Sequence, residues 1–290
     1  MTSVGAIFSP YPNAPEALID AAVAAERAGV RELWIWEDCF RHGAFSAASA
    51  ALAVTSELKV GIGIAPMPLR NVTATAMEIA TIARLFPGRL LPGIGHGVQS
   101  WMAQTGSRVA SPLTLMREYA PALRALLAGE TVTTTGRYVT LDAVRLDFAP
   151  ADVPLVYAAA EGPKTLAACG AAADGVVLNS LLTVEEAADG IARVNAGRAD
   201  AGRAGRHDVA GYVVAAFGPH AAERAASVWS DETPPDASDR VLAGTVEQVA
   251  SGVRRYADVG VDRVVLLPPA DEPDLAAYFE QVSAVARLVG

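Results

Sequence analysis

The sequence predicts an α/β protein, a (β/α)8 barrel (TIM barrel) that forms one domain over residues 1–290. Short β-rich runs alternate with Ala-rich helical stretches at intervals of roughly 25 to 40 residues, which is typical of βαβ units in a parallel sheet. The length falls within the range of one barrel domain with modest insertions. Eight predicted strands favour a closed barrel over an open sheet.

The predicted strands are runs rich in β-branched and aromatic residues. They are Val4 to Phe8, Glu32 to Trp36, Lys59 to Ile64, Leu90 to Ile94, Leu155 to Ala158, Gly175 to Leu178, Val209 to Ala216 and Arg263 to Leu267. Two helical stretches end in glycine, Pro15 to Ala28 at Gly29 and a later helix at Gly260. A left-handed glycine satisfies the last helical carbonyls, so both positions are predicted helix ends.

Two stretches interrupt this alternation. Residues 131–152 contain the Thr-rich, Gly-containing run Thr133 to Tyr138 and predict a β-hairpin inserted after the fourth barrel helix. Ser230 to Arg240 carries Pro234 and Pro235 among acidic and small residues, which predicts a mobile surface loop. This loop is either a lid or a solvated connector.

Composition restricts the partners. A formal charge of −9 and a pI near 5.0 oppose binding to a phosphate backbone, so no nucleic acid partner is expected. No apolar run approaches the roughly 20 residues of a membrane span, and the N-terminus lacks the parts of a signal peptide. We therefore expect no membrane partner and a cytoplasmic protein. Cys39 and Cys169 lack metal-type spacing and are expected to be free thiols.

A barrel enzyme builds its site at the carboxyl ends of the strands, where the βα loops meet. The second strand ends in Glu37-Asp38-Cys39, and neighbouring side chains point in different directions, so the two carboxylates are not expected to act as a pair. Each either lines the site or serves as a helix cap or exposed charge. The fourth strand ends in Gly95-His96-Gly97, where His96 is either a polar contact to a ligand or a buried, satisfied histidine.

The segment after the fifth strand is the best candidate for an anion site. Small residues such as Ala160 let a ring lie close to the strand, and Gly162 permits dihedrals closed to other residues. Pro163 suits the first position of a helix, whose free amides attract phosphate. The sequence has no HxH pair, HExxH helix, GxxxxGK[ST] loop or GxSxG turn, so no metal site is predicted. These residues alone indicate a barrel that binds a phosphorylated planar ligand.

A series of short motifs extends this interpretation. They are Ala25 to Gly29, Leu33 to Asp38, Leu58 to Ile64, Ala76 to Thr81, Pro87 to Arg89, Gly93 to Gly97, Leu126 to Val132, Gly162 to Lys164 and Ala173 to Val176. In this order they resemble the bacterial luciferase-like monooxygenase family, especially its deazaflavin-dependent branch. The resemblance covers nearly the whole chain.

The resemblance implies that the ring of a flavin or deazaflavin lies over the strand ends. In this family a bulge with a cis non-proline peptide on the third strand supports the ring, and Gly63-Ile64 matches that bulge. The phosphate contacts of the family match Gly95, His96 and Gly97 after the fourth strand and Ala160, Glu161 and Gly162 after the fifth. Gly175 and Val176 match a further region of cofactor contact.

The chain departs from the family at the end of the second strand. Many deazaflavin-dependent relatives carry Asp-His there, with the histidine acting in proton transfer, whereas Asp38 is followed here by Cys39. A thiol, with a reference pKa of about 8.5, can still donate a proton. Asp38, Cys39 and His96 are therefore the predicted catalytic residues, and a buried structural thiol is the alternative for Cys39.

The predicted function is hydride transfer to or from a small organic substrate with coenzyme F420, and the alternative is an FMN-dependent monooxygenase. The deazaflavin carries hydride whereas reduced FMN reacts with oxygen, so the cofactor decides the reaction class. A non-catalytic dimeric barrel and a phosphosugar isomerase or aldolase are rival interpretations. The family also implies a homodimer packed around the second and third helices, and Ala44 to Val54 is apolar nearly all round. No motif identifies the substrate.

Overall fold

The structure is a computed structural model that describes residues 2–229 and 234–290. Its strands are β1 (Ser3–Ile7), β2 (Glu32–Ile35), β3 (Lys59–Ile62), β4 (Ala65–Pro66), β5 (Leu90–Leu91), β6 (Gly93–Gly95), β7 (Val132–Thr135), β8 (Thr140–Val144), β9 (Tyr157–Ala159), β10 (Gly175–Leu178), β11 (Asp208–Phe217), β12 (Val241–Gly244) and β13 (Arg263–Leu267). Each predicted strand overlaps an observed one.

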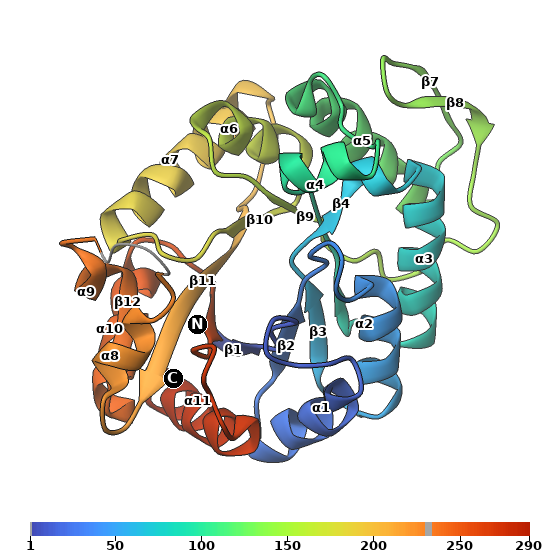
Figure 1. The fold of residues 1–290 in the computed structure, drawn as a ribbon. Helices are drawn as coiled ribbons and strands as arrows, with labels where there is room; N and C mark the ends of the chain where they lie inside the picture. The colour runs from blue at the N-terminus through green and yellow to red at the C-terminus, as the bar shows by residue number, and fades with distance from the viewer. Residues whose placement is uncertain (1, 230–233) are drawn as a thin grey trace.

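Helices surround the sheet (Figure 1). They are α1 (Ala17–Ala28), α2 (Ala44–Ala53), the 3-10 helix η1 (Met67–Leu69), α3 (Val72–Leu85), α4 (Gln99–Gln104), α5 (Pro112–Leu127), α6 (Pro163–Ala172), α7 (Val184–Asp200), α8 (Ala221–Ala226), α9 (Ala237–Arg240), α10 (Val246–Asp258) and α11 (Leu275–Val289). The predicted glycine ends of α1 and α10 are confirmed, with φ of 87° at Gly29 and 105° at Gly260. Within the described ranges, no helix combines the length and apolar character that a bilayer span requires.

The fold is α/β, with a curled parallel sheet. Among the described residues its order is β4-β6-β9-β10-β11-β13-β1-β2-β3-β5, and β12 pairs with β11. Both ends of this order belong to the same stretches of chain, because only Gly63 and Ile64 separate β3 from β4 and only Pro92 separates β5 from β6. The third and fourth predicted strands are thus each divided in two. Pro92 has no N–H to donate to a neighbouring strand.

The predicted surface loop from Ser230 to Arg240 is only partly a loop. Residues 230–233 lie outside the described part of the chain, and residues 237–240 form α9. The Arg240 guanidinium lies 2.7 Å from Asp236 Oδ2 and 2.7 Å from Glu186 Oε2 of α7, so α9 is tied to α7. The following strand, β12, was not predicted.

A separate antiparallel pair, β7 and β8, lies in the segment predicted as a hairpin. The Glu118 carboxylate of α5 accepts hydrogen bonds from the amides of Arg137, Tyr138 and Val139 in the turn, at 2.8–3.1 Å. The insertion is therefore fixed to α5.

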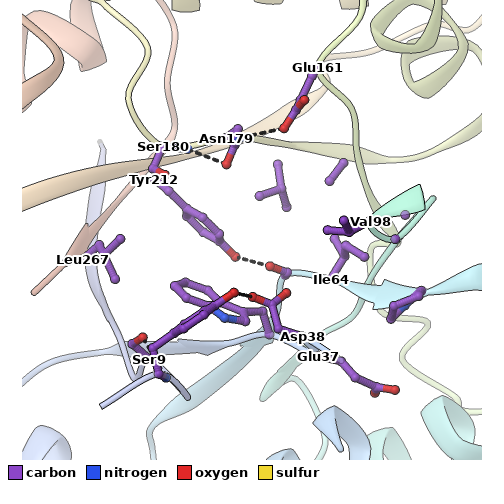
Figure 2. A pocket seen from close by; sticks show the side chains of 18 of the residues that line it. Ser9, Glu37, Asp38, Ile64, Val98, Glu161, Asn179, Ser180, Tyr212 and Leu267 are labelled. Carbon is purple, nitrogen blue, oxygen red and sulfur yellow. Dashed lines mark hydrogen bonds between the residues drawn. The ribbon is translucent and has the colours of Figure 1, made fainter. Parts of the chain in front are cut away.

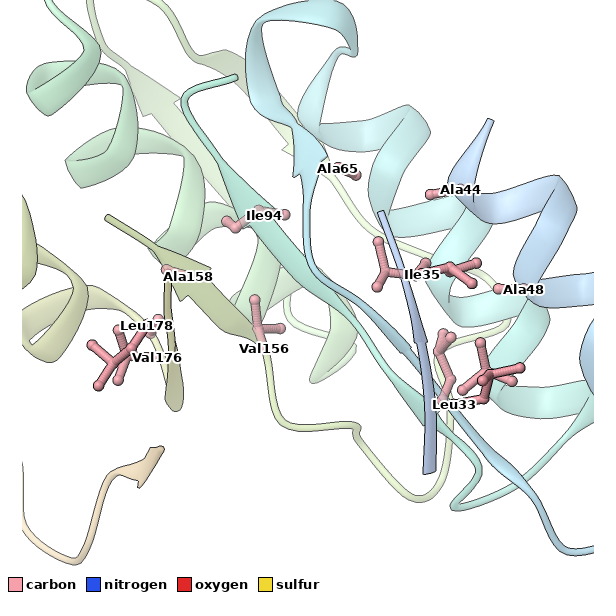
Figure 3. Close-up of a cluster of buried hydrophobic side chains, with 14 of the residues drawn as sticks. Leu33, Ile35, Ala44, Ala48, Ala65, Ile94, Val156, Ala158, Val176 and Leu178 are labelled. Carbon is pink, nitrogen blue, oxygen red and sulfur yellow. The ribbon is translucent and has the colours of Figure 1, made fainter. Parts of the chain in front are cut away.

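The core has one layer on each face of the sheet. Figure 3 shows Leu33 and Ile35 of β2 in the outer layer, toward Ala44 and Ala48 of α2. Because successive side chains of a strand point to opposite faces, Trp34 points inward. The inner layer is a smaller cluster of Ile7, Trp34, Leu91, Tyr157, Val177, Ala210, Tyr212 and Val265.

Trp34 fills the middle of the inner layer and is fully buried. The rings of Tyr157 and Tyr212 meet it edge-on, with centroid distances of 5.6 and 5.9 Å. A Cβ atom at Gly61 of the neighbouring strand β3 would overlap the indole. Glycine is required at position 61 because the indole approaches the β3 backbone so closely.

Charged side chains close the amino ends of the strands. Arg263 Nε lies 2.8 Å from Asp208 Oδ1 and 2.9 Å from the Tyr157 hydroxyl, and Arg263 also pairs with Glu32. Glu32 is only 4% exposed, and it accepts a hydrogen bond from Trp34 Nε1 at 3.3 Å. A buried charge is tolerated when it is paired and hydrogen-bonded. This network holds the inner aromatic layer from the amino end.

We predict that Gly61→Ala lowers the free energy of unfolding by about 1–3 kcal/mol, because the indole has no room to move away from the new methyl group. As a matched control, Gly190→Ala in α7 meets Leu178 Cδ2 at an ordinary 3.5 Å and is expected to raise the free energy of unfolding by up to about 1 kcal/mol. Urea denaturation measures both. Equal stability of the two variants would contradict the packing described.

Candidate active site

A cavity of about 1020 Å³ opens at the carboxyl ends of the parallel strands. Its wall consists of Ser9, Tyr11 and Pro12; Trp36 to Asp38; Gly63, Ile64 and Pro66; Gly95 to Gln99; Trp101 and Pro112; Ala159 to Gly162 and Thr165; Val177, Asn179 and Ser180; Tyr212 and Val214; Ser227 and Val228; and Leu267 to Ala270. Figure 2 shows side chains from several strands and loops pointing into this space. The inner layer forms its floor, because Val177 and Tyr212 belong to both.

Most of the predicted site residues lie on this one wall. They are Asp38, Gly63, Ile64, Gly95, His96, Gly97, Ala160, Glu161 and Gly162. These residues come from four separate stretches of the sequence, and parallel strands bring their carboxyl ends to the same edge of a sheet.

Four predicted site residues do not line the cavity: Cys39, Pro163, Gly175 and Val176. Val176 is fully buried in the outer layer, and its neighbour Val177 faces the cavity instead, because side chains alternate along β10. Gly175 begins β10 at the opposite end of the strand, where it packs against the Tyr157 ring. Pro163 is the first residue of α6, as predicted.

The third-strand bulge has the predicted peptide geometry. The Gly63-Ile64 bond is cis, as the resemblance implied. The Tyr212 hydroxyl donates to the Gly63 carbonyl at 3.2 Å (Figure 2), and a Cβ atom at position 63 would overlap that hydroxyl. Glycine at 63 thus lets Tyr212 support the backbone beneath Ile64.

Glu37 has a structural partner at each carboxylate oxygen. Its Oε2 accepts a hydrogen bond from the amide of Ala44, the first residue of α2, at 3.0 Å. Its Oε1 lies 2.6 Å from Arg70 Nη1, and Arg70 also contacts Glu78. The sequence left open whether Glu37 lines the site or serves as a helix cap. Both interpretations apply, because Glu37 lines the cavity and also caps α2.

Asp38 is held differently. Its Oδ2 accepts a hydrogen bond from the Tyr11 hydroxyl at 2.7 Å, and no second partner is found for its carboxylate among the described side chains. Burial raises the pKa of Asp38, while the Tyr11 hydrogen bond and the Arg41 charge act to lower it. Burial and the Asp38 carboxylate raise the pKa of Tyr11 to about 12, so Tyr11 keeps its proton at neutral pH.

Both cysteines are free thiols, as predicted. Burial, followed by the negative charges of Glu37 and Asp38, raises the pKa of the Cys39 thiol. Burial also raises the pKa of Cys169, inside α6, to about 12. A thiol with a raised pKa outside the cavity wall is poorly placed for proton transfer to a ligand.

Two ring nitrogens of the cavity wall have no hydrogen-bond partner among the residues that the structure describes. They are Nε2 of His96 and Nε1 of Trp36, and both atoms are buried. Burial lowers the pKa of His96, which is therefore neutral at pH 7. Buried polar groups without a partner are rare in proteins and mark positions for a ligand or water. Over the described ranges, no group of three or more His, Cys, Asp or Glu side chains is arranged to hold a metal ion.

The turn before α6 differs from the prediction in one respect. Gly162 has φ −77° and ψ 148°, an extended conformation open to any residue, so the expectation of unusual dihedrals was wrong. Space is open around it, with only Thr165 Oγ1 within reach of a Cβ atom at 3.9 Å. Beside it, Asn179 donates to Glu161 at 2.6 Å (Figure 2), which turns that carboxylate toward β10.

Sequence reasoning missed Tyr11, Trp36, Asn179 and Tyr212 as site residues. Tyr11 was within reach of prediction, because it lies in the loop that follows the first strand, where barrel enzymes place site residues. Asn179 directly follows β10, so its position at a strand end could also have predicted it. Tyr212 lies inside a ten-residue strand, where no local pattern separates it from ordinary core.

The parallel sheet and the cavity at its carboxyl ends define an α/β protein whose cavity lies where barrel enzymes have their active sites. The chain matches the luciferase-like monooxygenase family over residues 2–241 and belongs to this family.

Two curated relatives carry names that refer to specific reactions. The chain is 32% identical to 5,10-methylenetetrahydromethanopterin reductase of Methanolobus tindarius over 159 residues, 55% of this chain and 48% of that protein. It is 32% identical to F420-dependent glucose-6-phosphate dehydrogenase of Nocardia farcinica over 181 residues, 57% of this chain and 54% of that protein. The chain spans about half the length of these curated relatives.

Solved structures share the fold over the whole chain. An F420-dependent secondary alcohol dehydrogenase in complex with an F420-acetone adduct has a TM-score of 0.87 at 20% identity, covering 100% of this chain and 99% of that one. The oxygenating constituent of 3,6-diketocamphane monooxygenase from Pseudomonas putida, in complex with FMN, has a TM-score of 0.80 at 16% identity, covering 100% and 98%. At these identities the likeness shows the fold alone.

We predict that the pKa of His96 lies below the ordinary value of about 6.5 in the free protein, because burial disfavours the charged ring. An NMR titration of histidine-labelled protein measures it, and a His96→Gln variant assigns the signal. A pKa at or above the ordinary value would mean that the ring is solvated rather than turned into the cavity wall.

Proposed function

We propose that this chain is an oxidoreductase that uses coenzyme F420 for hydride transfer to or from a small organic substrate. The observation that carries the proposal is the similarity to relatives whose names include F420-dependent dehydrogenases, within a family to which the chain belongs. The cavity supports it, because its position and lining match what such a cofactor needs. The whole protein's activity and substrate remain part of this proposal.

The residues present fit the cofactor. The cavity is large enough for a tricyclic ring with a phosphorylated side chain. Ile64, Ala159 and Val177 offer an apolar surface for the ring, while the unpartnered nitrogens of Trp36 and His96 are free to hydrogen-bond its polar edge. When bound, F420 supplies a hydride carrier comparable to nicotinamide.

We place the cofactor's phosphate at the amino end of α6, beside Gly162. The first amides of a helix are unpaired, and the helix adds about half a positive charge there. The turn from Gly95 to Gly97 is the second proposed contact. We also propose that the two divided strands, β3 with β4 and β5 with β6, complete the predicted (β/α)8 barrel, because the sheet order begins and ends on them.

An FMN-dependent monooxygenase is the second candidate. It is favoured by the family itself, because the model that matches residues 2–241 is that of the luciferase-like monooxygenases. The apolar surface of Ile64, Ala159 and Val177 and the proposed phosphate position suit both ring systems. Measured binding of each cofactor therefore distinguishes the two candidate functions.

We further propose a cytoplasmic homodimer that packs on α2 and α3. The outward side of α2 carries small residues such as Ser46 and Ala53, and Met77 of α3 is 57% exposed. Small side chains allow two copies to approach closely, and an exposed large apolar side chain is suited to burial in an interface.

We predict micromolar or tighter binding of F420 or FMN, no measurable binding of NAD, and at least about tenfold weaker binding by Gly162→Asp. Gly162→Asn is the matched control, because Asn has the shape of Asp without its charge, and this variant is expected to bind like the wild type. Asp and Asn both suit the extended backbone and both cap helices well, so the two variants differ in charge.

Fluorescence titration measures the affinities, and circular dichroism confirms that each variant is folded. Equal affinity of the two folded variants would place the phosphate elsewhere, with the turn at residues 95–97 as the next position to test. Failure to bind either cofactor would overturn the proposed function.

A further inference from the structure

The proposed cofactor contacts occupy only part of the cavity wall. They lie on β3 to β6, β9 and β10, with Trp36 after β2, and the rest of the wall follows β1, β2, β11 and β13. We name this remaining part the substrate wall; it includes Ser9, Tyr11, Glu37, Asp38, Val228 and residues 267–270. Figure 2 shows Ser9, Asp38 and Leu267 on one side of the cavity and Val98 on the other. The substrate wall is largely apolar; its charged residues are Glu37, which is paired with Arg70, and Asp38.

The charges around the cavity are all of one sign. Its charged lining residues are Glu37, Asp38 and Glu161, and no lysine or arginine lines the cavity within the described part of the chain. Residues 230–233, outside that part, are Ser-Asp-Glu-Thr in the sequence and contain no cationic side chain. Arg70 is already engaged by carboxylates, and His96 is neutral.

We propose that the substrate wall accepts an uncharged alcohol or carbonyl compound and rejects phosphorylated substrates, and that Asp38, with Tyr11, contacts the reacting oxygen. An anionic substrate would meet the acidic groups of the lining, while Arg41, which stacks on Tyr11 outside the lining, already faces the Asp38 carboxylate. Acidic groups in a largely apolar space disfavour a buried negative charge. This inference rests on the proposed function. It separates the chain from relatives named F420-dependent glucose-6-phosphate dehydrogenases.

Asp38 and Tyr11 are placed to hold a hydroxyl group. The Tyr11 hydroxyl occupies Oδ2 of Asp38 at 2.7 Å, which leaves Oδ1 for a substrate. The Arg41 guanidinium lies over the Tyr11 ring, 4.2 Å from its centroid, and holds the ring in place. Cys39, which follows Asp38 in the chain, does not line the cavity.

The proton balance of the proposed step is simple. In alcohol oxidation, the C–H bond would break with its electron pair, and a bound oxidised deazaflavin would supply the hydride acceptor. The Asp38 carboxylate would take the hydroxyl proton as the C=O bond forms. In carbonyl reduction, protonated Asp38 would return the proton to the oxygen, and a bound reduced deazaflavin would supply the hydride. Tyr11 keeps its own proton and stabilises the ionised form of Asp38.

The first experiment compares substrates on the F420-loaded protein. Oxidation of 2-propanol and cyclohexanol is followed by the loss of deazaflavin absorbance, and glucose 6-phosphate is assayed alongside. Calorimetry measures the binding of cyclohexanone and of glucose 6-phosphate to the same protein. We expect turnover of the alcohols and binding of the ketone, with neither turnover nor binding of the phosphosugar.

Each contrary result has a defined meaning. Turnover or binding of glucose 6-phosphate would overturn the inference, and so would inactivity toward both alcohols in a protein that binds F420. A protein that binds neither F420 nor FMN would overturn the proposed function itself, which the cofactor titration reports separately.

The second experiment removes the two polar groups. Asp38→Asn is expected to lower kcat by about 100-fold or more, the usual effect of losing a general base. Tyr11→Phe is expected to lower kcat less and to move the acid limb of the pH profile to higher pH. The sign follows because the Tyr11 hydrogen bond lowers the pKa of Asp38, so its loss raises that pKa and protonates Asp38 at higher pH. The Arg41 charge, which also lowers the pKa of Asp38, is present in both the wild type and Tyr11→Phe.

Tyr278→Phe is the matched control, because the Tyr278 hydroxyl is buried in α11 and has no hydrogen-bond partner. It is expected to keep the kcat and the pH profile of the wild type. An unmoved acid limb in folded, F420-binding Tyr11→Phe would overturn the role of Tyr11. Loss of turnover in Cys39→Ala together with retained turnover in Asp38→Asn would overturn the role of Asp38.

Discussion

The close packing of aromatic rings against glycine inside the curled sheet is the constraint on which the rest of the structure depends. Trp34 occupies the middle of the inner layer, Tyr157 and Tyr212 meet it edge-on, and Gly61 leaves the space that the indole fills. This filling closes the interior to ligands and sets the depth of the cavity. The Tyr212 hydroxyl also donates a hydrogen bond to the Gly63 carbonyl. The aromatic layer at the cavity floor therefore also supports the third-strand bulge.

The polar groups at the two ends of the sheet differ in how completely they are hydrogen-bonded. At the amino ends, Arg263 and its partners Glu32 and Asp208 satisfy one another, which leaves little for a ligand to contact. At the carboxyl ends, Asp38 and His96 retain atoms without a protein partner. Satisfied charges stabilise a fold, whereas unsatisfied ones next to a cavity are available for binding and chemistry. The contrast supports the proposed site at the carboxyl ends of the strands.

Local sequence patterns were sufficient to predict eight strand positions and the glycine helix ends, but not the division of the third and fourth strands or the existence of β12. The family resemblance was insufficient at Val176, where a shift of one residue exchanges the outer face for the cavity, and Val177 lines the cavity instead. The expectation from glycine's conformational freedom was wrong at Gly162, since a glycine before a helix is compatible with an ordinary extended backbone. Gly61 is required because the Trp34 indole of the neighbouring strand leaves no room for a Cβ atom there. Such a requirement depends on a contact between strands and not on the local sequence.

The departure from the family pattern at Cys39 illustrates how neighbouring strands share a site. The second strand ends in three consecutive polar residues, and the structure gives them different surroundings: Glu37 caps α2 and pairs with Arg70, Asp38 faces the cavity, and Cys39 stays outside its wall. The adjacent loop after β1 supplies Tyr11, which donates a hydrogen bond to Asp38 because the pairing of β1 with β2 brings the two loops together. A group that supports the carboxylate of one βα loop is thus supplied by the next loop, since parallel strands deliver both to the same edge. The thiol at position 39 is then compatible with an active site.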